Sequence, residues 1–335
     1  MTYTQLLAAA QARPENPEWH RLRSEGVTAS EIAAVMGISP WNSPFSLYWQ
    51  KANGWSEPEN PEMAAGRRAE PVIADWYLEV ADPLDVLKME RAGLYASVER
   101  PYQIATPDRL LYSQCDECDG SGYCWIKRYG YQQTACEDCI GTGVAGPVLA
   151  PLECKYVIGS WDGWGPSGSD IIPVHYRAQA LWQADVMDVD ETQVAAWHGA
   201  ELRVYRIGRD DGDLAVMRAE AELFLNRLAA GEVPPLDGHE ATLRTLKALH
   251  PDLEDREQTI SPATAEGYRR ARALKQRAEK MCDRFEVRLR AEMGAAARAV
   301  DAAGRKVASR SLFTVAESVR AAYDVDRLNP ARSPK

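Results

Sequence analysis

Two Cys-x-x-Cys pairs lie close together in the chain, and each is followed by a Gly-x-Gly turn. Cys115 and Cys118 form the first pair, in "CDECDGSG", and Cys136 and Cys139 form the second, in "CEDCIGTG". This C-x2-C-x17-C-x2-C spacing lies in the range of four-thiolate zinc sites. A segment so short and polar gains its fold from the metal. The sequence therefore predicts a structural zinc knuckle within residues 114–146.

The residues around the cysteines leave three alternatives to zinc open: an iron–sulfur cluster, a redox dithiol, or no metal at all. The CxxCxGxG phrases resemble the knuckles of DnaJ-type zinc domains, in which glycine lets the backbone turn tightly around the thiolates. Four thiolates leave zinc no open position for water, so such a site is structural. Any chemistry is then expected elsewhere in the chain.

The composition is that of a globular protein in a reducing compartment. The 335 residues are 45% hydrophobic, which is enough for a substantial core. The seven cysteines are an odd number and favour metal binding over a disulfide framework. With no long apolar run and no secretory start, we expect a cytoplasmic protein without a membrane segment. The net charge of −10 argues against a broadly basic surface, although an acidic metal site can still receive phosphates.

The segments up to residue 240 predict a mixed α/β core. Thr28 and Glu31 in "EGVTASEIAAVMGIS" indicate a capping box at a helix start. The segment "EMAAGRRAEPVIADWYLEVA" predicts a helix that starts or kinks at Pro71. Short apolar runs from Leu94 onward predict strands, then a helix in "PVHYRAQALWQADVMDV", further strands, and a helix ended by Gly231. This order is typical of helices packed on a sheet.

The composition changes after residue 240, and residues 241–335 are expected to form a helical appendage. Ser261 and Pro262 mark a helix start, and Gly294 marks its end. Apolar residues between them are spaced by three and four, as in the seam of a coiled coil or helical hairpin. These residues are Ala271, Leu274, Ala278, Met281 and Phe285. The later segment "AGRKVASRSLFTV" predicts a short strand or hairpin.

Two carboxylates and a lysine flank the cysteine segment. Asp108 stands in "IATPDRLLY" before it, and Glu153 and Lys155 stand in "LAPLECKYV" after it. In a strand, Glu153 and Lys155 project to the same face. With the cysteine segment excised the two strands become neighbours, so we expect the three side chains to meet at one end of a sheet. Carboxylates and the backbone carbonyl of Cys154 are hard oxygen ligands of the kind Mg²⁺ accepts, and the ammonium of Lys155 can polarise water.

An E-x-K phrase alone more often marks an ordinary surface strand. The motifs around it must therefore decide between a surface strand and a metal-binding site. The PD…ExK pattern resembles that of the restriction-endonuclease-like nucleases. The phrase "EWHRLRSEGVTASEI" specifically resembles the lambda exonuclease and YqaJ-type viral recombinase family, as does the order "GRRAEP", "ATPD", "LECK" and "HYRAQALWQ" within residues 17–235. The resemblance implies a restriction-endonuclease-like α/β core in residues 1–240, with a central mixed sheet flanked by helices and the zinc knuckle inserted into it.

The resemblance also implies how the carboxylates and the lysine act. It makes Asp108 and Glu153 ligands of a catalytic Mg²⁺ or Mn²⁺, together with the carbonyl of Cys154. It makes Glu70 a further acidic ligand near the metal. Lys155 becomes the catalytic lysine.

Four further residues match positions of that family. Tyr176 and Gln179 match a YxxQ helix that lines the active site, and Arg23 and Ser30 match positions that hold the terminal 5′-phosphate of DNA. A guanidinium group suits that anion. Each residue also has a plainer interpretation, as a packing, capping or solvated group. The chain departs from the family at Arg109, where glycine is usual, and in its zinc insertion, which the lambda enzyme lacks.

The function implied by the resemblance is Mg²⁺-dependent digestion of linear double-stranded DNA from 5′ to 3′, which leaves a single strand for an annealing protein. The family also implies a ring-shaped homotrimer and, for a phage-encoded protein, the cytoplasm of a bacterial host. Two alternatives stay open. One is a structure-specific or internally cutting endonuclease, and the other is a catalytically silent, nuclease-derived DNA-binding module.

Overall fold

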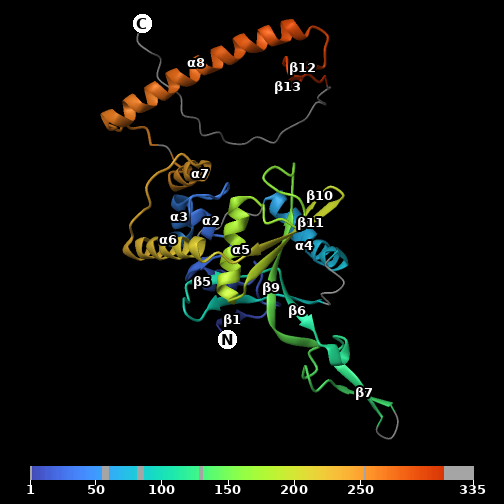
Figure 1. Ribbon diagram of the computed structural model, residues 1–335. Coiled ribbons are helices and arrows are strands. Elements are labelled where there is room, and N and C mark those ends of the chain that lie inside the picture. The colour runs from blue at the N-terminus through green and yellow to red at the C-terminus, as the bar shows by residue number, and fades with distance from the viewer. Residues whose placement is uncertain (1, 55–59, 81–86, 128–130, 253, 313–335) are drawn as a thin grey trace. The chain divides into compact units, whose positions relative to one another are not determined.

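The computed structural model describes residues 2–54, 60–80, 87–127, 131–252 and 254–312. The chain folds into two compact units, Met1–Leu249 and His250–Lys335. The first unit contains sheets and helices packed against each other (Figure 1). The mixed α/β fold expected from the sequence is therefore confirmed. No helix in the described ranges is long and apolar enough to cross a membrane.

A five-stranded mixed sheet forms the centre of the first unit, in the order β11-β10-β9-β6-β3. Its strands are Leu87–Arg91 (β3), Arg109–Gln114 (β6), Val144–Tyr156 (β9), Glu191–His198 (β10) and Glu201–Gly208 (β11). β9 runs parallel to β10, and the other neighbouring pairs are antiparallel. The long strand β9 therefore belongs to the core at one end and extends beyond it at the other.

The helices that cover this sheet are Pro61–Val80 (α4) and Val174–Met187 (α5). They pack on opposite faces of the sheet. The evidence comes from consecutive residues of one strand, whose side chains point to opposite faces. Leu111 of β6 joins a buried cluster with Tyr77 of α4, while the preceding Leu110 joins a second cluster with Trp182 of α5. The sheet is thus buried on both faces, and α5 brings its side chains onto the β9 surface.

Helix α4 begins at Pro61, so Pro71 does not mark its start as the sequence analysis considered. Proline inside a helix removes one backbone hydrogen bond. The buried side chains of Ala69, Ile73 and Tyr77 offset that loss by packing on the sheet. Glu70 therefore projects from the middle of a helix rather than from its first turn.

A second sheet of four strands carries the N-terminal part of the chain, in the order β1-β4-β5-β2. Its strands are Tyr3–Leu7 (β1), Val27–Thr28 (β2), Leu94–Ser97 (β4) and Gln103–Ala105 (β5). Leu94 and Ile104 form its buried core, and Leu22 of helix α1 (Pro17–Ser24) packs against them. The chain passes from α1 directly into β2, which brings the two into contact.

Four further helices of the first unit are Ile32–Val35 (α2), Pro44–Asn53 (α3), Asp211–Ala230 (α6) and Glu240–Leu249 (α7). The expected capping box at α2 forms only in part: the Thr28 N–H donates to the Glu31 carboxylate at 2.9 Å, but the Glu31 N–H bonds the Thr28 carbonyl. α7 packs on α3, where the buried hydroxyls of Ser43 and Thr242 lie 2.7 Å apart. This contact extends the first unit to Leu249, beyond the boundary at 240 expected from the sequence.

Strands β6 and β9 continue beyond the core into an arm that carries the cysteine segment (Figure 1). Their pairing reaches Gln114 opposite Val144. The remaining elements of the arm are Asp116–Cys118 (η1), Tyr123–Lys127 (β7) and Tyr131–Ala135 (β8). β7 and β8 form an antiparallel hairpin. The cysteine segment is thus an insertion between two strands of the central sheet.

The second unit contains one long helix, Pro262–Met293 (α8), and a hairpin of Arg298–Val300 (β12) and Lys306–Ser309 (β13). Ser261 caps the helix by accepting from the Thr264 N–H at 3.1 Å, and the helix ends before Gly294. None of its residues is buried. The described part of this unit holds no second helix, so the coiled coil stays a prediction. Residues 313–335 lie outside the described ranges.

Candidate active site

The carboxylate of Asp108 lies immediately before β6, beside the strand that carries Glu153. β6 pairs with β9 so that Arg109 stands opposite Leu152. This register lets Asp108 Oδ2 accept a hydrogen bond of 2.7 Å from the backbone N–H of Cys154. Strand pairing therefore brings together two segments that are 46 positions apart in the sequence.

Three side chains donate hydrogen bonds to the buried carboxylate of Glu153. Lys155 Nζ lies 2.7 Å from Oε1, Gln179 Nε2 lies 2.6 Å from Oε1, and Gln183 Nε2 lies 2.6 Å from Oε2. Lys155 also donates to Gln179 Oε1 at 3.0 Å. Both glutamines come from α5. Glu153 is therefore held in one orientation by its own strand and by the helix that covers it.

Burial and crowded negative charge control protonation at this site. Burial raises the pKa of Asp108 well above its usual range, and the charges of Glu153 and Glu70 raise it further. Burial lowers the pKa of Lys155, but Glu153, Tyr176 and Asp108 together outweigh that effect and the net shift is upward. Lys155 is therefore an ammonium group at neutral pH.

Glu70 is near this group but forms an ion pair with Arg109, with Nη1 and Oε1 2.5 Å apart. Arg109 Nη1 also donates to the backbone carbonyl of Asp108 at 2.7 Å. The arginine that stands at the usual glycine position thus holds the turn after Asp108 with its own side chain. A cation that bound Glu70 would therefore compete with Arg109 for the charge of this carboxylate.

The donors present suit a divalent cation that prefers oxygen. Burial, followed by the charges of Glu153 and Glu70, raises the pKa of Asp108, and a cation at the carboxylates would favour its charged form. The carboxylates of Asp108 and Glu153 are thus donors of the type that such a cation accepts.

Gln183 is absent from the sequence prediction, although it binds Glu153 as closely as Gln179 does. Its side chain is fully buried, and its Oε1 has no hydrogen-bond partner. An unpaired buried acceptor costs about 1–3 kcal/mol, which offsets what the hydrogen bond from Nε2 to Glu153 contributes. The available signal was its position four residues after Gln179, which places both on one face of α5.

Tyr176 provides an aromatic surface beside the lysine. Lys155 Nζ lies 4.6 Å from the centroid of the Tyr176 ring. Tyr176 and Gln179 are three residues apart on α5, and both contact Lys155. The two side chains of the YxxQ phrase therefore meet the same amine.

Arg23 and Ser30 form a second polar group, near the end of α1. Arg23 Nη2 donates to Ser30 Oγ at 3.1 Å and to Thr28 Oγ1 at 3.3 Å. Lys51 lies beside them, where it donates to the Arg23 carbonyl at 3.1 Å and pairs with Glu31 at 2.9 Å. Two cations and one carboxylate leave an excess of positive charge next to two hydroxyls. Such a group suits a phosphate.

Four buried cysteines converge in the arm, with all their sulfur atoms within 4.8 Å of one another. Cys115 and Cys136 Sγ lie 3.9 Å apart, and Cys118 and Cys139 Sγ lie 3.7 Å apart. A tetrahedral zinc ion with Zn–S bonds of about 2.3 Å separates its sulfurs by about 3.8 Å. The cysteine geometry therefore fits zinc.

Backbone N–H groups stabilise negative charge on two of these sulfurs. Gly122 N–H donates to Cys118 Sγ at 3.3 Å, and Gly143 N–H donates to Cys139 Sγ at 3.1 Å. Burial raises the pKa of Cys139, but the Gly143 N–H and the neighbouring thiols lower it more, to about 6. Gly143 has a φ of 75°, and a Cβ there would collide with the backbone carbonyl of Gly120. The glycines are therefore part of the cysteine site.

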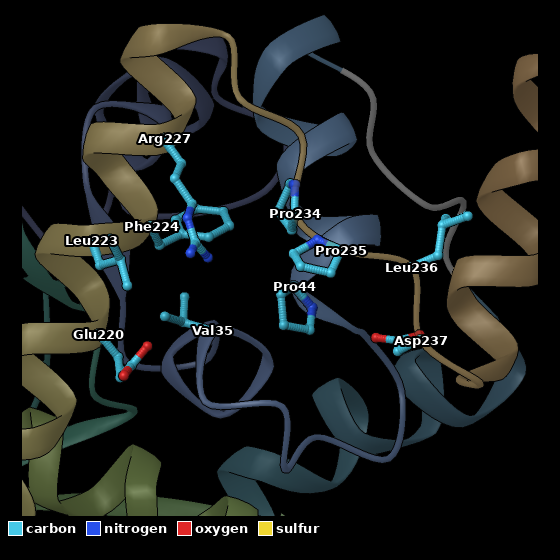
Figure 2. Close-up of a pocket in the computed structure, with 10 residues that line it drawn as sticks. All are labelled: Val35, Pro44, Glu220, Leu223, Phe224, Arg227, Pro234, Pro235, Leu236 and Asp237. Atoms are coloured by element: carbon cyan, nitrogen blue, oxygen red, sulfur yellow. The ribbon is translucent and has the colours of Figure 1, made fainter.

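A separate cavity of about 280 Å³ lies beside α6 (Figure 2). Its walls include Val35, Pro44, Phe224, Pro234 and Pro235, and none of the residues of the carboxylate site. Glu220, Arg227 and Asp237 add charged groups to this lining. The cavity is thus separate from the carboxylate site.

A family match covers the part of the chain that carries this site. The model of the YqaJ-like viral recombinase domain matches residues 18–190. The protein YqaJ of Bacillus subtilis (strain 168) is 22% identical over 248 residues, which are 71% of this chain and 64% of that protein. The chain thus spans less than two thirds of the length of this curated relative.

Several solved structures are similar at low sequence identity. The alkaline exonuclease LHK-Exo from Laribacter hongkongensis is 20% identical, with a TM-score of 0.43 over 70% of this chain and 99% of that chain. Its complex with dAMP gives a TM-score of 0.44 over the same shares. A putative exonuclease from Eubacterium rectale is 12% identical, with a TM-score of 0.37 over 76% of this chain and 97% of that chain.

Proposed function

This chain belongs to the family of the YqaJ-like viral recombinase domain, and we propose that it is an exonuclease that hydrolyses linear double-stranded DNA from a 5′ end. One observation carries the proposal. Asp108, Glu153 and Lys155 are brought together by two paired strands and by α5, which is the placement that phosphodiester hydrolysis with a metal-activated water needs. An ordinary surface strand would leave Glu153 and Lys155 exposed, whereas both side chains are largely buried.

The cation would be Mg²⁺ or Mn²⁺, held by Asp108, Glu153 and the carbonyl of Cys154, with Glu70 joining if it leaves Arg109. When bound, such a cation lowers the pKa of a water molecule and stabilises negative charge on the oxygens of the phosphodiester. The raised pKa of Asp108 and the hard oxygen donors support this assignment.

Lys155 acts as a cation that positions water, rather than as a base that removes its proton. Its raised pKa keeps it protonated at neutral pH, so its amine can donate a hydrogen bond but cannot accept one. Glu153 and Gln179 fix two directions of the amine, and the Tyr176 ring lies against it. The ammonium therefore stays in place as negative charge develops on the phosphate.

Gln183→Leu should lower the apparent Mg²⁺ affinity in DNA hydrolysis by about 10- to 100-fold, the usual effect of removing a hydrogen bond to a metal ligand. Folding stability should stay near parental, because the variant also removes the unpaired Oε1. The control is Gln193→Leu, which removes another buried glutamine. Gln193 accepts from Tyr77 at 2.6 Å on the α4 face of the sheet, whereas Glu153 bonds to α5 on the other face. Gln193→Leu should lower folding stability, because Tyr77 loses its partner, and should leave the Mg²⁺ dependence of DNA hydrolysis like that of the parent. If the rate of DNA hydrolysis depended on Mg²⁺ concentration in the same way for Gln183→Leu and the parent, Gln183 would only fill space.

Three activities are separated by one comparison of substrates. An exonuclease digests end-labelled linear duplex DNA in Mg²⁺ and leaves closed circular duplex intact. A structure-specific or internally cutting endonuclease cuts the circle or a branched duplex. A silent DNA-binding module binds DNA without cutting it. The burial of Lys155 against Glu153 favours the enzymes over the binding module, because such an ion pair is costly to keep without a use.

Arg23→Ala should slow digestion of a 5′-phosphorylated end by about tenfold more than digestion of a 5′-hydroxyl end. The reason is the loss of charge-assisted hydrogen bonds to the terminal phosphate in the group formed with Thr28 and Ser30. The measurement is the initial rate on paired substrates that differ only in that phosphate. Arg21→Ala is the control, because Arg21 lies on the same helix and pairs with Glu18 and Glu25 instead. Equal slowing of both ends by Arg23→Ala would assign Arg23 a structural or general DNA-binding role.

The partners follow from this activity. The substrate is double-stranded DNA, and the strand left behind would be bound by a single-strand annealing protein. We also propose a ring-shaped homotrimer, the cytoplasm of a bacterial host as its site of action, and a structural zinc ion in the arm. The trimer is tested by the mass of the native assembly in solution.

A further inference from the structure

An exposed tryptophan lies at the border of the carboxylate site. The side chain of Trp41 is 51% exposed, although tryptophan is usually well covered. Its ring centroid lies 4.8 Å from that of His175 and 5.7 Å from that of Tyr176. Tyr176 in turn lies against Lys155. A single tyrosine ring therefore lies between the exposed tryptophan and the amine of Lys155.

Contacts on both sides of the residue hold Trp41 in place. The backbone N–H of Trp41 donates to Ser39 Oγ at 3.2 Å, and the backbone carbonyl of Trp41 accepts from Arg244 Nη2 at 3.1 Å. The His175 ring supports one side of the indole edge-on, with an angle of 84° between the rings. Burial and the charge of Lys155 lower the pKa of His175 to about 4, so this support is a neutral ring at pH 7. Trp41 thus presents a preformed flat surface that loses little freedom when it binds a ring.

We propose that the exposed face of Trp41 stacks on an unpaired base of the nucleotide next to the scissile phosphodiester. This inference rests on the proposed function, since Lys155 marks where the phosphate lies. The ligand is a nucleobase because the surface is aromatic, and any base fits because each has a π-face. A base in a duplex is already stacked, so Trp41 engages the strand end only after the terminal pairs open. Stacking there would favour the opened end and feed it into the site.

The test combines variants of the protein with DNA substrates that lack a single base. The substrates are 5′-phosphorylated linear duplexes that carry natural nucleotides or one abasic nucleotide at the first, second or third position from the 5′ end. The variants are Trp41→Ala and Trp41→Phe. Trp125→Ala is the matched control, because Trp125 is 67% exposed on β7 in the arm. Zinc content and unfolding temperature verify that each variant is folded.

Trp41→Ala should slow single-turnover release from natural duplex by about tenfold, as expected for one lost base stack. The parent should slow by a similar factor when the abasic nucleotide occupies the stacked position. On that substrate Trp41→Ala should cause little further loss, because the stack is already missing. Trp41→Phe should recover most of the rate, and Trp125→Ala should match the parent throughout.

Equal slowing by Trp41→Ala on the natural duplex and on all three abasic duplexes would overturn the proposal and leave Trp41 a packing role beside Tyr176. If the parent digests no DNA, the proposed function fails, and stacking is then tested by binding alone. In that case Trp41→Ala should weaken binding of a natural single-stranded oligonucleotide about tenfold, and should not weaken binding of an abasic one. Identical binding of the natural oligonucleotide by parent and variant would overturn the stacking site independently.

Discussion

Lys155→Met should reduce single-turnover cleavage of linear duplex DNA by about 10²–10⁴-fold even at saturating Mg²⁺, while DNA binding stays near parental. The buried amine is held by Glu153, Gln179 and the Tyr176 ring, and an ammonium group has no lone pair to bind a metal. We therefore expect it to act on water and phosphate. An interaction made mainly in the transition state lowers the rate of the chemical step when it is lost. Methionine is used because its length fills the space that alanine would leave empty.

Asp108→Ala and Glu153→Ala should also abolish hydrolysis, but through the metal. Their apparent Mg²⁺ affinity should fall so far that high Mg²⁺ restores part of the rate, whereas the loss in Lys155→Met should persist at saturating Mg²⁺. Mg²⁺ titration of DNA cleavage and of binding separates these causes. Lys275→Met, at an exposed lysine of α8, is the control and should match the parent. Cleavage by Lys155→Met at the parental rate would refute the assignment of the E-x-K phrase.

The sequence was sufficient to predict which strands meet at the site. Asp108 and Glu153 are separated by a segment whose cysteines already indicated an independent metal-bound fold, so removing it made their strands neighbours. The observed register, with Arg109 opposite Leu152, agrees with that reasoning. The phrase "ECK" also predicted that Glu153 and Lys155 share a face, because the period of a strand is two. Local periodicity and an excised insertion were enough for this step.

The sequence could not predict how the side chains pair across elements. Glu70 and Arg109 each resemble a free site residue in the sequence, yet they form an ion pair between α4 and β6. The spacing of Gln183 from Gln179 places it on the same face of α5, but that spacing does not say which strand residue the face meets. Such contacts depend on tertiary packing, which leaves no period in the sequence. For the same reason α4 continues through Pro71, since its burial on the sheet outweighs one missing hydrogen bond.

Cys118→Ser should remove the zinc, about one ion per chain in the parent, and unfold the arm. The four sulfurs have the spacing of a zinc tetrahedron, and Gly122 N–H already donates to Cys118 Sγ. Structural zinc contributes about 10–16 kcal/mol in small zinc domains, far more than a short polar segment can recover by other contacts. Elemental analysis should show the lost metal, and limited proteolysis should show new cleavage within residues 115–143.

Cys124→Ser is the matched control, because this fifth cysteine packs beside the cluster without being one of the four converging sulfurs. It should retain zinc and resist proteolysis like the parent. Iron with visible absorption, or an intact arm without metal, would replace the zinc assignment. Cys118→Ser should nevertheless keep DNA hydrolysis within a few-fold of the parent, because Asp108 and Glu153 lie at the opposite ends of β6 and β9 from the cysteines. A total loss of hydrolysis with the core still folded would mean that the arm itself contributes to the reaction, as a DNA contact rather than as a separate metal-bound insertion.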